Sequence, residues 1–576
     1  MFKYKNVLIS VCTIALMVGC ASSLGQSEGT NASPMNGNYY SPKAKLYGDY
    51  LAASYANHLG DANARAQYFS RAFALKHEDI NLGRKAMASA LSAGDHALAR
   101  TLAIEIQALD QQDGLSIAIL GAHALSKGKY TQAISYLSAE NTDASLAEIN
   151  ALMRGWAQFG QGGDEEALET FTLPKGGKYF QFIGSLQKAK LYAQMGDMVN
   201  AEKYFKLVDE IGVSSVESTL SQARSYVENK EKDRALERLE AFAEKNGGAL
   251  TGPIRTYIDA LETGGKLNTK LSPAQSASRA LTEPAFGFYS VQNQYEAAEM
   301  FLQLALELDP KNDKARLFLG SVLVDIDRED DAMQAYKKIK SNSPYAVSAR
   351  LSEASLLFDK DEDAAALRTL NAIYKSHPSK VTQSSLGRAY LIMEDYASAL
   401  PYYDELISQM TEEELQKNPT PRYIKGICLE RLDRWQEAVV EFEYVLKHQP
   451  DNSDVLNYLG YTWVDKGVKL TQAFDMIRKA VRLEPESGAI IDSLGWAHYK
   501  LGQYSEARIQ LEDAAQYSPT SATIIDHLGD VYWRLGRIRE AGYQWNRALT
   551  LDPTDKEIIS LKAKLNGGLG AADSVQ

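Results

Sequence analysis

Few side chains in this sequence are of the types that enzymes use for nucleophilic or metal chemistry. Of its three cysteines, Cys12 lies in an apolar N-terminal segment, Cys20 directly follows that segment, and Cys428 stands alone far along the chain. If Cys12 is removed with the N-terminal segment and Cys20 is modified, only Cys428 remains. A single cysteine can form neither an internal disulfide nor a multi-cysteine metal site. Cys428 falls in a helical pattern, where we expect a buried, inert thiol; the alternative is a reactive nucleophile.

The histidines and glycines offer no stronger candidate for catalysis. None of the eight histidines lies in an HExxH pair, and His498 occupies a position where a packed core side chain is expected. Residues 162–166, GGDEE, look like the start of the GGDEF signature of nucleotide cyclases. That chemistry needs a β-hairpin, whereas this segment sits where a turn between helices is expected. We therefore expect no cofactor, no metal and no enzymatic activity.

Cys20 is the residue whose surroundings predict a definite modification. Lys3 and Lys5 precede an apolar stretch over residues 7–18, too short to span a bilayer, and the sequence then reads LMVGCAS. This resembles the bacterial lipobox, which implies a signal peptide over 1–19 and a lipidated Cys20. The alternative is an ordinary secretory signal with a chance cysteine. Ala21, in place of the Asp of inner-membrane retention signals, favours the outer membrane, with the chain facing the periplasm.

The charge of the chain argues against a nucleic-acid partner. The chain of 576 residues carries a formal charge of -12, so it repels nucleic-acid phosphates and we expect no nucleic-acid partner. Residues 21–43 are rich in Ser, Gly, Asn and Pro, and with Cys20 they form a predicted flexible tether over 20–43. After the N-terminus no apolar run approaches the roughly 18 residues that a membrane span needs.

A period of 34 residues runs through the rest of the sequence. Prolines recur at 310, 344, 378, 450, 485, 519 and 553, with gaps of 34, 34, 72, 35, 34 and 34. Alanine stands twelve residues before each proline, from Ala298 to Ala541, and small residues stand twelve residues before most of these alanines. In the N-terminal half, glycines recur every 34 residues at 60, 94, 128, 162 and 196.

This spacing predicts antiparallel helix pairs. Small residues let the two helices approach closely, a glycine or polar turn joins them, and proline ends the second helix because it lacks the N–H that the helix needs. One such pair cannot bury its apolar face, so neighbouring pairs must stack. The units at 492–519 and 526–553 resemble the tetratricopeptide repeat family over roughly residues 46–553. The resemblance implies an all-α solenoid of stacked hairpins, forming a right-handed superhelix.

The period also predicts how the chain is divided. Ala235 and Ala298 are 63 residues apart, five short of two repeats, and Gly264-Gly265 lies between them. We expect two lobes: an N-terminal array over 44–263, an irregular junction over 264–285, and a C-terminal array over 286–554. A capping helix over 555–566 and a flexible tail over 567–576 would follow. Residues 408–421 read as an insertion that projects as a loop.

In the repeat family, certain first-helix positions face a concave surface that binds partners. In this sequence the resemblance implies a groove formed by Tyr461, Asp492, Trp496, Tyr499, Lys500, Asp526, Asp530, Trp533 and Arg534. Aspartates where chaperone-binding members have Lys or Asn argue against an acidic C-terminus as ligand and favour a partner with apolar and basic groups. The alternative is that the tryptophans pack between neighbouring repeats.

These features predict a lipid-anchored scaffold that binds protein or peptide partners. The lipobox, the tether and repeats such as LNYLGYTWVDKG (456–467) are similar to outer-membrane lipoprotein adaptors of carboxyl-terminal processing proteases. That similarity implies delivery of substrates to an envelope protease, or the organisation of cell-wall hydrolases. The alternative is an assembly factor or pilotin for an outer-membrane or secretion component; an enzyme is the remote alternative.

Overall fold

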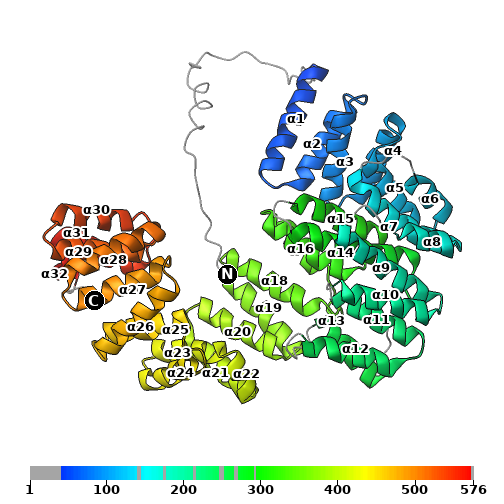
Figure 1. Ribbon diagram of the computed structural model, residues 1–576. Coiled ribbons are helices and arrows are strands. Elements are labelled where there is room, and N and C mark those ends of the chain that lie inside the picture. Colours follow the sequence, from blue (N-terminus) through cyan, green and yellow to red (C-terminus); the bar gives the residue numbers. More distant parts are fainter. Residues whose placement is uncertain are drawn as a thin grey trace, which may run out of the picture. The chain divides into compact units, whose positions relative to one another are not determined.

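A computed structural model describes residues 41–572, apart from 139–143, 173–176, 212–215, 246–251, 265–269 and 291–293. Cys20, the predicted signal peptide and nearly all of the predicted tether lie outside the described residues. Within the described ranges every regular element is a helix and no strand occurs, which confirms the all-α prediction (Figure 1). None of these helices combines the length and apolar character needed to cross a bilayer.

The chain divides into two compact units, and the first ends at Gln111. It contains two helix pairs: α1 (Pro42–His58) with α2 (Ala62–Ala74), and α3 (Ile80–Ser92) with α4 (His96–Leu109). Sequence period alone placed the main division near residues 264–285. That division stays a prediction, and the boundary between the two compact units lies after Gln111.

The second unit begins at Gln112 and continues the series of hairpins. Its first pairs, up to the predicted junction, are α5 (Gly114–Ser126) with α6 (Tyr130–Leu137), α7 (Ala144–Gln161) with α8 (Asp164–Thr170), α9 (Gly177–Gln194) with α10 (Met198–Glu210), and α11 (Val216–Glu228) with α12 (Lys232–Lys245). Helix α13 (Gly252–Thr263) follows and packs against α11 and α12.

The later hairpins follow the same plan. They pair α14 (Pro273–Ser290) with α15 (Tyr295–Leu308), α16 (Asp313–Asp325) with α17 (Glu329–Lys337), α18 (Ala346–Asp359) with α19 (Asp363–Ser376), α20 (Lys380–Ile392) with α21 (Tyr396–Ser408), α23 (Thr420–Arg431) with α24 (Trp435–His448), α25 (Ser453–Asp465) with α26 (Leu470–Leu483), α27 (Gly488–Lys500) with α28 (Tyr504–Tyr517), and α29 (Ala522–Arg534) with α30 (Ile538–Ala548). The fold is therefore a solenoid of stacked helical hairpins.

In the first five hairpins a glycine turn connects the two helices at the position that the sequence predicts. The five glycines spaced by 34 residues all have positive φ, between +68° and +92°. Residues with a Cβ adopt this conformation only at a cost, so glycine is favoured there. Gly162, in the segment that looks like a cyclase signature, is one of these turns, and α8 begins two residues later.

The small residues of each hairpin accept a large side chain from the opposite helix. An added Cβ at Gly529 would lie 2.5 Å from Trp545 Nε1, and one at Gly320 would lie 2.2 Å from the Tyr336 ring. The alanines of the 34-residue period are fully buried, including Ala298 and Ala541. This packing is the physical reason for the spacing that the sequence displays.

Five of the seven prolines in the series follow the end of a helix closely, as predicted, whereas α17 and α30 end at Lys337 and Ala548, well before Pro344 and Pro553. Helices α15, α19, α24, α26 and α28 each stop two residues before a proline of the series.

Residues 408–421 differ from the expected projecting loop, because they include a short helix, α22 (Glu412–Lys417), with a capping box at Thr411. Tyr444 donates a hydrogen bond to Glu412 at 2.8 Å, which ties this helix to α24.

The expected irregular junction over 264–285 is largely helical instead. Helix α14 fills residues 273–290, pairs with α15, and also packs against α5, α7 and α9 of the preceding hairpins (Figure 1). His123 Nδ1 on α5 lies 2.7 Å from Glu307 Oε1 on α15. Because α14 is covered on two sides, it buries Ala277, Ala280 and Leu281 completely. Sequence spacing alone did not reveal these contacts.

The C-terminal end of the solenoid is closed by one further helix. Helix α31 (Asp555–Gly567) begins at a capping box formed by Thr554 and Glu557, and it packs against α30. A single turn, α32 (Leu569–Ala572), follows in the part predicted to be a flexible tail. Leu561 and Leu569 are buried in the apolar cluster of the last hairpin, so this segment covers its apolar face.

Candidate partner-binding groove

The predicted groove residues lie on three neighbouring first helices. Tyr461 is on α25; Asp492, Trp496, Tyr499 and Lys500 are on α27; Asp526, Asp530, Trp533 and Arg534 are on α29. Helix α27 packs against both α25 and α29, so the fold brings these side chains to adjacent helices. Their contacts show which of them remain accessible to a partner.

A stack of three aromatic rings crosses from α27 to α29. The Trp496 ring lies 4.6 Å from the Tyr499 ring, with 9° between planes, and 4.1 Å from the His527 ring, with 18° between planes. Trp496 is half-buried, and its Nε1 has no hydrogen-bond partner among the described residues. Trp496 therefore packs between repeats, as the alternative to a binding role expects, while part of its surface stays exposed.

Asp492 is occupied by the same histidine. His527 Nδ1 lies 2.9 Å from Asp492 Oδ1, and both side chains are about nine-tenths buried. Burial lowers the pKa of His527, but the charge and hydrogen bond of Asp492 raise it further, so the net pKa lies above its usual value. The carboxylate of Asp492 therefore serves an internal ion pair.

Asp526 and Asp530 bind the chain's own C-terminal helix. Lys564 on α31 donates to Asp526 Oδ1 at 2.7 Å and to Asp530 Oδ2 at 2.9 Å. Asp530 also accepts a hydrogen bond of 2.9 Å from Trp545 Nε1. Burial and the neighbouring Asp526 raise the pKa of Asp530 to about 6, which Lys564 only partly offsets.

Trp533 is covered by the same C-terminal segment. Gly568, directly after α31, lies so close that an added Cβ would be 2.1 Å from Trp533 Cζ2. The indole also packs at 5.4 Å from the Trp545 ring and joins the apolar cluster of the last hairpin. Trp533 thus anchors the cap of the solenoid.

Of the predicted groove residues, those that remain accessible are aromatic or basic, whereas the predicted aspartates are paired within the chain. Lys500 and Arg534 are exposed, whereas Tyr461 and Tyr499 are half-buried. Lys500 Nζ lies 3.1 Å from Asp465 Oδ1, and Arg534 Nε donates to the Tyr499 hydroxyl at 3.1 Å. The aspartates that the family resemblance predicts to face a partner instead form ion pairs with His527 and Lys564.

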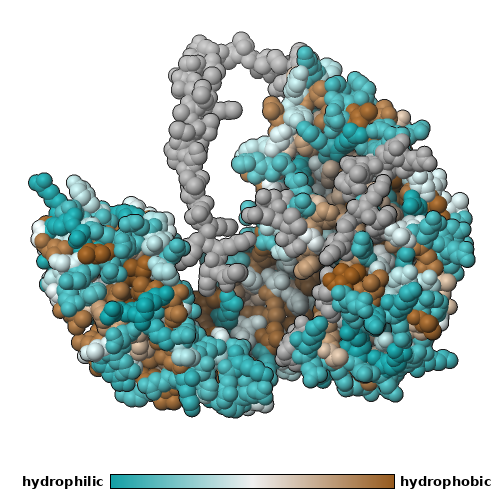
Figure 2. All heavy atoms as spheres, viewed as in Figure 1, coloured by the Kyte–Doolittle hydropathy of each residue, from teal (hydrophilic) through white to brown (hydrophobic). Residues whose placement is uncertain are grey.

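A second surface, which the sequence reasoning missed, lies on the first helix and its C-cap residue, Leu59. Tyr47, Leu51, Tyr55 and Leu59 are 57%, 68%, 64% and 61% exposed, and we call this row the α1 ridge. Large apolar side chains at four-residue spacing share one side of a helix. Elsewhere, Figure 2 shows a mainly hydrophilic surface with scattered apolar patches in this view. The four-residue spacing of these side chains was visible in the sequence, but the prediction followed the small residues of the 34-residue period and did not include them.

The side chains considered for chemistry are packed in the structure. Cys428 is fully buried, and burial raises the pKa of its thiol to about 11. His498 Nδ1 lies 2.7 Å from Gln503 Oε1, and its ring packs edge-on against Phe474 at 4.8 Å. Among the described residues no group of His, Cys, Asp or Glu could hold a metal ion.

The geometry defines an α-solenoid of helical hairpins, and comparison of its sequence with known proteins identifies the kind of repeat. Residues 292–345 and 493–556 match models of the tetratricopeptide repeat. The chain is also similar to the "TPR repeat-containing protein PA4667" of Pseudomonas aeruginosa, with 27% identity over 211 residues, which is 36% of this chain and 29% of that protein.

Other similarities extend over more of this chain. The "Protein CTR9 homolog" of Arabidopsis thaliana is 24% identical over 322 residues, 54% of this chain and 26% of that protein. The chain thus spans less than a third of the length of either relative. Among solved structures, the "APC/C hetero-tetramer Cut9-Hcn1" aligns over 92% of this chain and 96% of the solved chain, with 14% identity and a TM-score of 0.36. "Yeast Tom70" aligns over 93% and 97%, with 14% identity and a TM-score of 0.29.

Proposed function

We propose that this protein is a lipid-anchored scaffold that faces the periplasm at the outer membrane and binds protein partners. Acylation of Cys20, which the LMVGC sequence supports, would fix one end at the bilayer. As a flexible coil, the stretch between Cys20 and α1 would span roughly 25–30 Å. The folded part would then reach partners close to the membrane surface.

The observation that carries a binding role is the α1 ridge. Its four large side chains are each more than half exposed, although the opposite side of α1 buries Ala53 and Ala56 against its own unit. A row of exposed apolar side chains along one helix is a feature of surfaces that bind other proteins, and it supports the proposal. Tyrosine and leucine at four-residue spacing suit an apolar groove on a partner protein.

The aromatic and basic rim of α27 and α29 offers a second contact surface. Tyr499, Lys500 and Arg534 combine ring surface with cationic groups. Two separate surfaces on one anchored chain let it hold an envelope protease or cell-wall hydrolase together with its substrate. Bringing two proteins together in this way raises their effective concentration, without any catalytic step by the scaffold itself.

Site-specific photo-crosslinking in cells tests this proposal. A photoreactive phenylalanine analogue would replace Tyr55 on the α1 ridge, Tyr499 on the rim, or Val199 as a control. Val199, on α10, is 83% exposed and stands outside both surfaces. We expect discrete adducts with envelope proteins at Tyr55 and Tyr499 but not at Val199. Adducts with lipid alone at Tyr55, or equal adducts at all three positions, would reject the proposal.

The anchor needs its own test. In a Cys20→Ala variant we expect the chain to leave the outer-membrane fraction and to lose any fatty acyl label. A chain that carries no acyl group in its unaltered form would contradict the proposed localisation while leaving protein binding open to the crosslinking experiment.

A further inference from the structure

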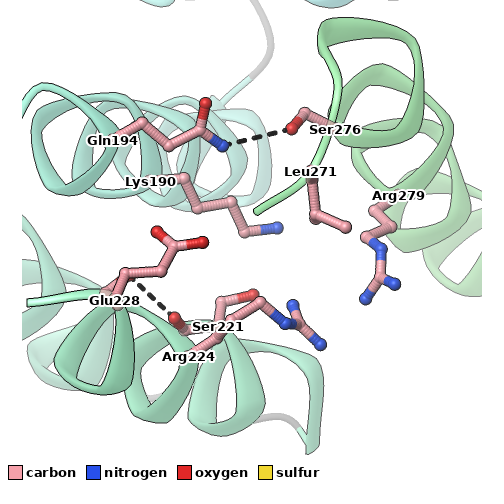
Figure 3. Close-up of a pocket in the computed structure, with 9 residues that line it drawn as sticks. Lys190, Gln194, Ser221, Arg224, Glu228, Leu271, Ser276 and Arg279 are labelled. Atoms are coloured by element: carbon pink, nitrogen blue, oxygen red, sulfur yellow. Dashed lines mark hydrogen bonds between the residues drawn. The ribbon is translucent and has the colours of Figure 1, made fainter. Parts of the chain in front are cut away.

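A pocket of about 180 Å³, partly open to solvent, lies in the second unit, where α11, α13, α14 and α16 meet the segment before α18. Its wall includes Glu217, Arg224, Tyr257, Arg279, Lys314 and Tyr345. A smaller pocket shares Arg224 and Arg279 and adds Lys190 from α9. Figure 3 shows the Lys190 side chain reaching from α9 into the space between Arg224 and Arg279.

Lys190 is a buried cation whose charge is poorly compensated. Its side chain is 10% exposed, and its Nζ has no hydrogen-bond partner among the described residues. The nearest carboxylate oxygen, Glu217 Oε1, lies 3.7 Å away. Burial accordingly lowers the pKa of Lys190 to about 8, despite the opposing charge of Glu217. Buried ammonium groups are costly unless they are paired at hydrogen-bond distance.

One further donor on the wall of the larger pocket lacks a partner. Arg224 Nε is buried and makes no hydrogen bond within the described part of the chain, and the buried Tyr257 hydroxyl has the Arg224 guanidinium beside it, which opposes the rise in the tyrosine pKa that burial causes. Arg279 approaches a carboxylate only at 3.9 Å, again at Glu217. Buried polar groups in folded proteins nearly always have partners, so unmatched donors around one pocket point to a missing acceptor.

The charges do not balance around this space. Lys314 is paired with Glu283 at 2.6 Å and also lies 3.6 Å from Glu217 Oε2. Lys190, Arg224 and Arg279 then remain, set against the single buried carboxylate of Glu217.

Glu228 lines the smaller pocket, and burial raises the pKa of its carboxyl group. Even with Glu217 and Glu228 both ionised, the three cations Lys190, Arg224 and Arg279 outnumber the two carboxylates by one. The two pockets together therefore carry an excess of positive charge and of hydrogen-bond donors.

We propose that the larger pocket binds a small oxyanion of the phosphate class. Arg224 and Arg279 present guanidinium groups that match such oxygens, the Tyr257 hydroxyl supplies a neutral donor, and Lys190 adds charge from the adjoining pocket. On the same measure of volume a single water needs about 10–15 Å³, so the pocket has room for one tetrahedral anion or several waters. The bound anion would tie α14 to the hairpins of α9 and α11.

Calorimetric titration with inorganic phosphate tests this proposal on the detergent-solubilised full-length chain at low ionic strength. We expect one site with a dissociation constant below about 1 mM, which chloride at the same ionic strength does not mimic. A second titration with glycerol 3-phosphate distinguishes the two sources of this chemistry. Tighter binding of inorganic phosphate indicates a free anion, and tighter binding of the ester indicates a lipid headgroup.

Two matched arginine variants test whether phosphate binds at this pocket. Arg279→Gln should weaken phosphate binding by at least about tenfold, the cost of one lost charge-assisted contact. Arg255→Gln is the control, because Arg255 on α13 is 53% exposed and pairs with Asp259 within its own helix. No binding by the unaltered chain up to about 10 mM phosphate, or equal affinity in both variants, would overturn the proposal.

A second measurement covers the case in which Arg279→Gln fails to fold. Hydrogen exchange of the unaltered chain, with and without phosphate, should show new protection in α11 and α14. Protection confined to other helices, or none at all, would overturn the proposal.

Discussion

Lys564 provides the sharpest test of how the solenoid is closed. It is 7% exposed, and its ammonium group binds both Asp526 and Asp530 on α29. Replacing it by methionine keeps most of the side-chain volume and removes only the charge. The Lys564→Met variant then leaves the buried Asp530 and the partly buried Asp526 without their shared cation.

The expected cost follows from this arrangement. Removing one partner of a buried ion pair typically destabilises a protein by about 3–5 kcal/mol, because the remaining charge stays buried. Asp530 already has a pKa of about 6 with Lys564 present, so it escapes part of this cost by binding a proton. We therefore expect about 3 kcal/mol near neutral pH, the lower end of that range, and less near pH 5.

Native-state hydrogen exchange measures this loss locally, which suits a repeat protein that need not unfold in one step. A loss of about 3 kcal/mol corresponds to roughly a hundredfold faster exchange in α29 and α31. Lys562→Met is the matched control, since Lys562 lies on the same helix and is exposed. If both variants exchanged at the same rate, the role of Lys564 in closing the solenoid would be refuted.

Three further predictions concern the hairpins and the last repeat. Gly529→Val should cost about 1–3 kcal/mol in thermal unfolding because a Cβ there meets the opposite indole, whereas Gly542→Ala, which has open space, should be neutral or stabilising. Cys428 should resist alkylation at pH 8 until the chain unfolds, since its thiol is buried with a pKa near 11; rapid labelling of folded protein would contradict its burial. Asp492 raises the pKa of His527 in the folded chain, so protonation of His527 stabilises the fold below about pH 6.5. This stabilisation should disappear as the pH rises through the pKa of the folded state, and a His527→Gln variant should lack that part of the pH dependence of unfolding.

The repeat architecture was predictable because its determinants are local. Gly320 and Gly529 must be small to accept a ring from the partner helix, and Gly162 must adopt a positive φ. Such steric requirements recur at fixed spacing, so they appear directly in the sequence. Burial of Ala298 and Ala541 follows from the same register.

Contacts between distant segments were not predictable from that register. The packing of α14 against α5 and α7 depends on how successive hairpins turn, which no residue spacing encodes. The pairing of Lys564 with Asp526 joins residues 38 positions apart and uses a helix outside the period. For that reason the carboxylates of α29 were expected to face a partner, although they bind the chain's own cap.

Co-purification of envelope proteins with variants of the α1 ridge tests the central claim most directly. The double variant Leu51→Lys, Tyr55→Lys places charge in the middle of the ridge, and Val199→Lys adds charge to an exposed site elsewhere. We predict that the ridge variant recovers at least about tenfold less partner protein, because it removes two apolar contacts of about 1 kcal/mol or more. The Val199→Lys variant should recover as much partner protein as the unaltered chain. Undiminished partner recovery with the folded, membrane-localised ridge variant would contradict the account.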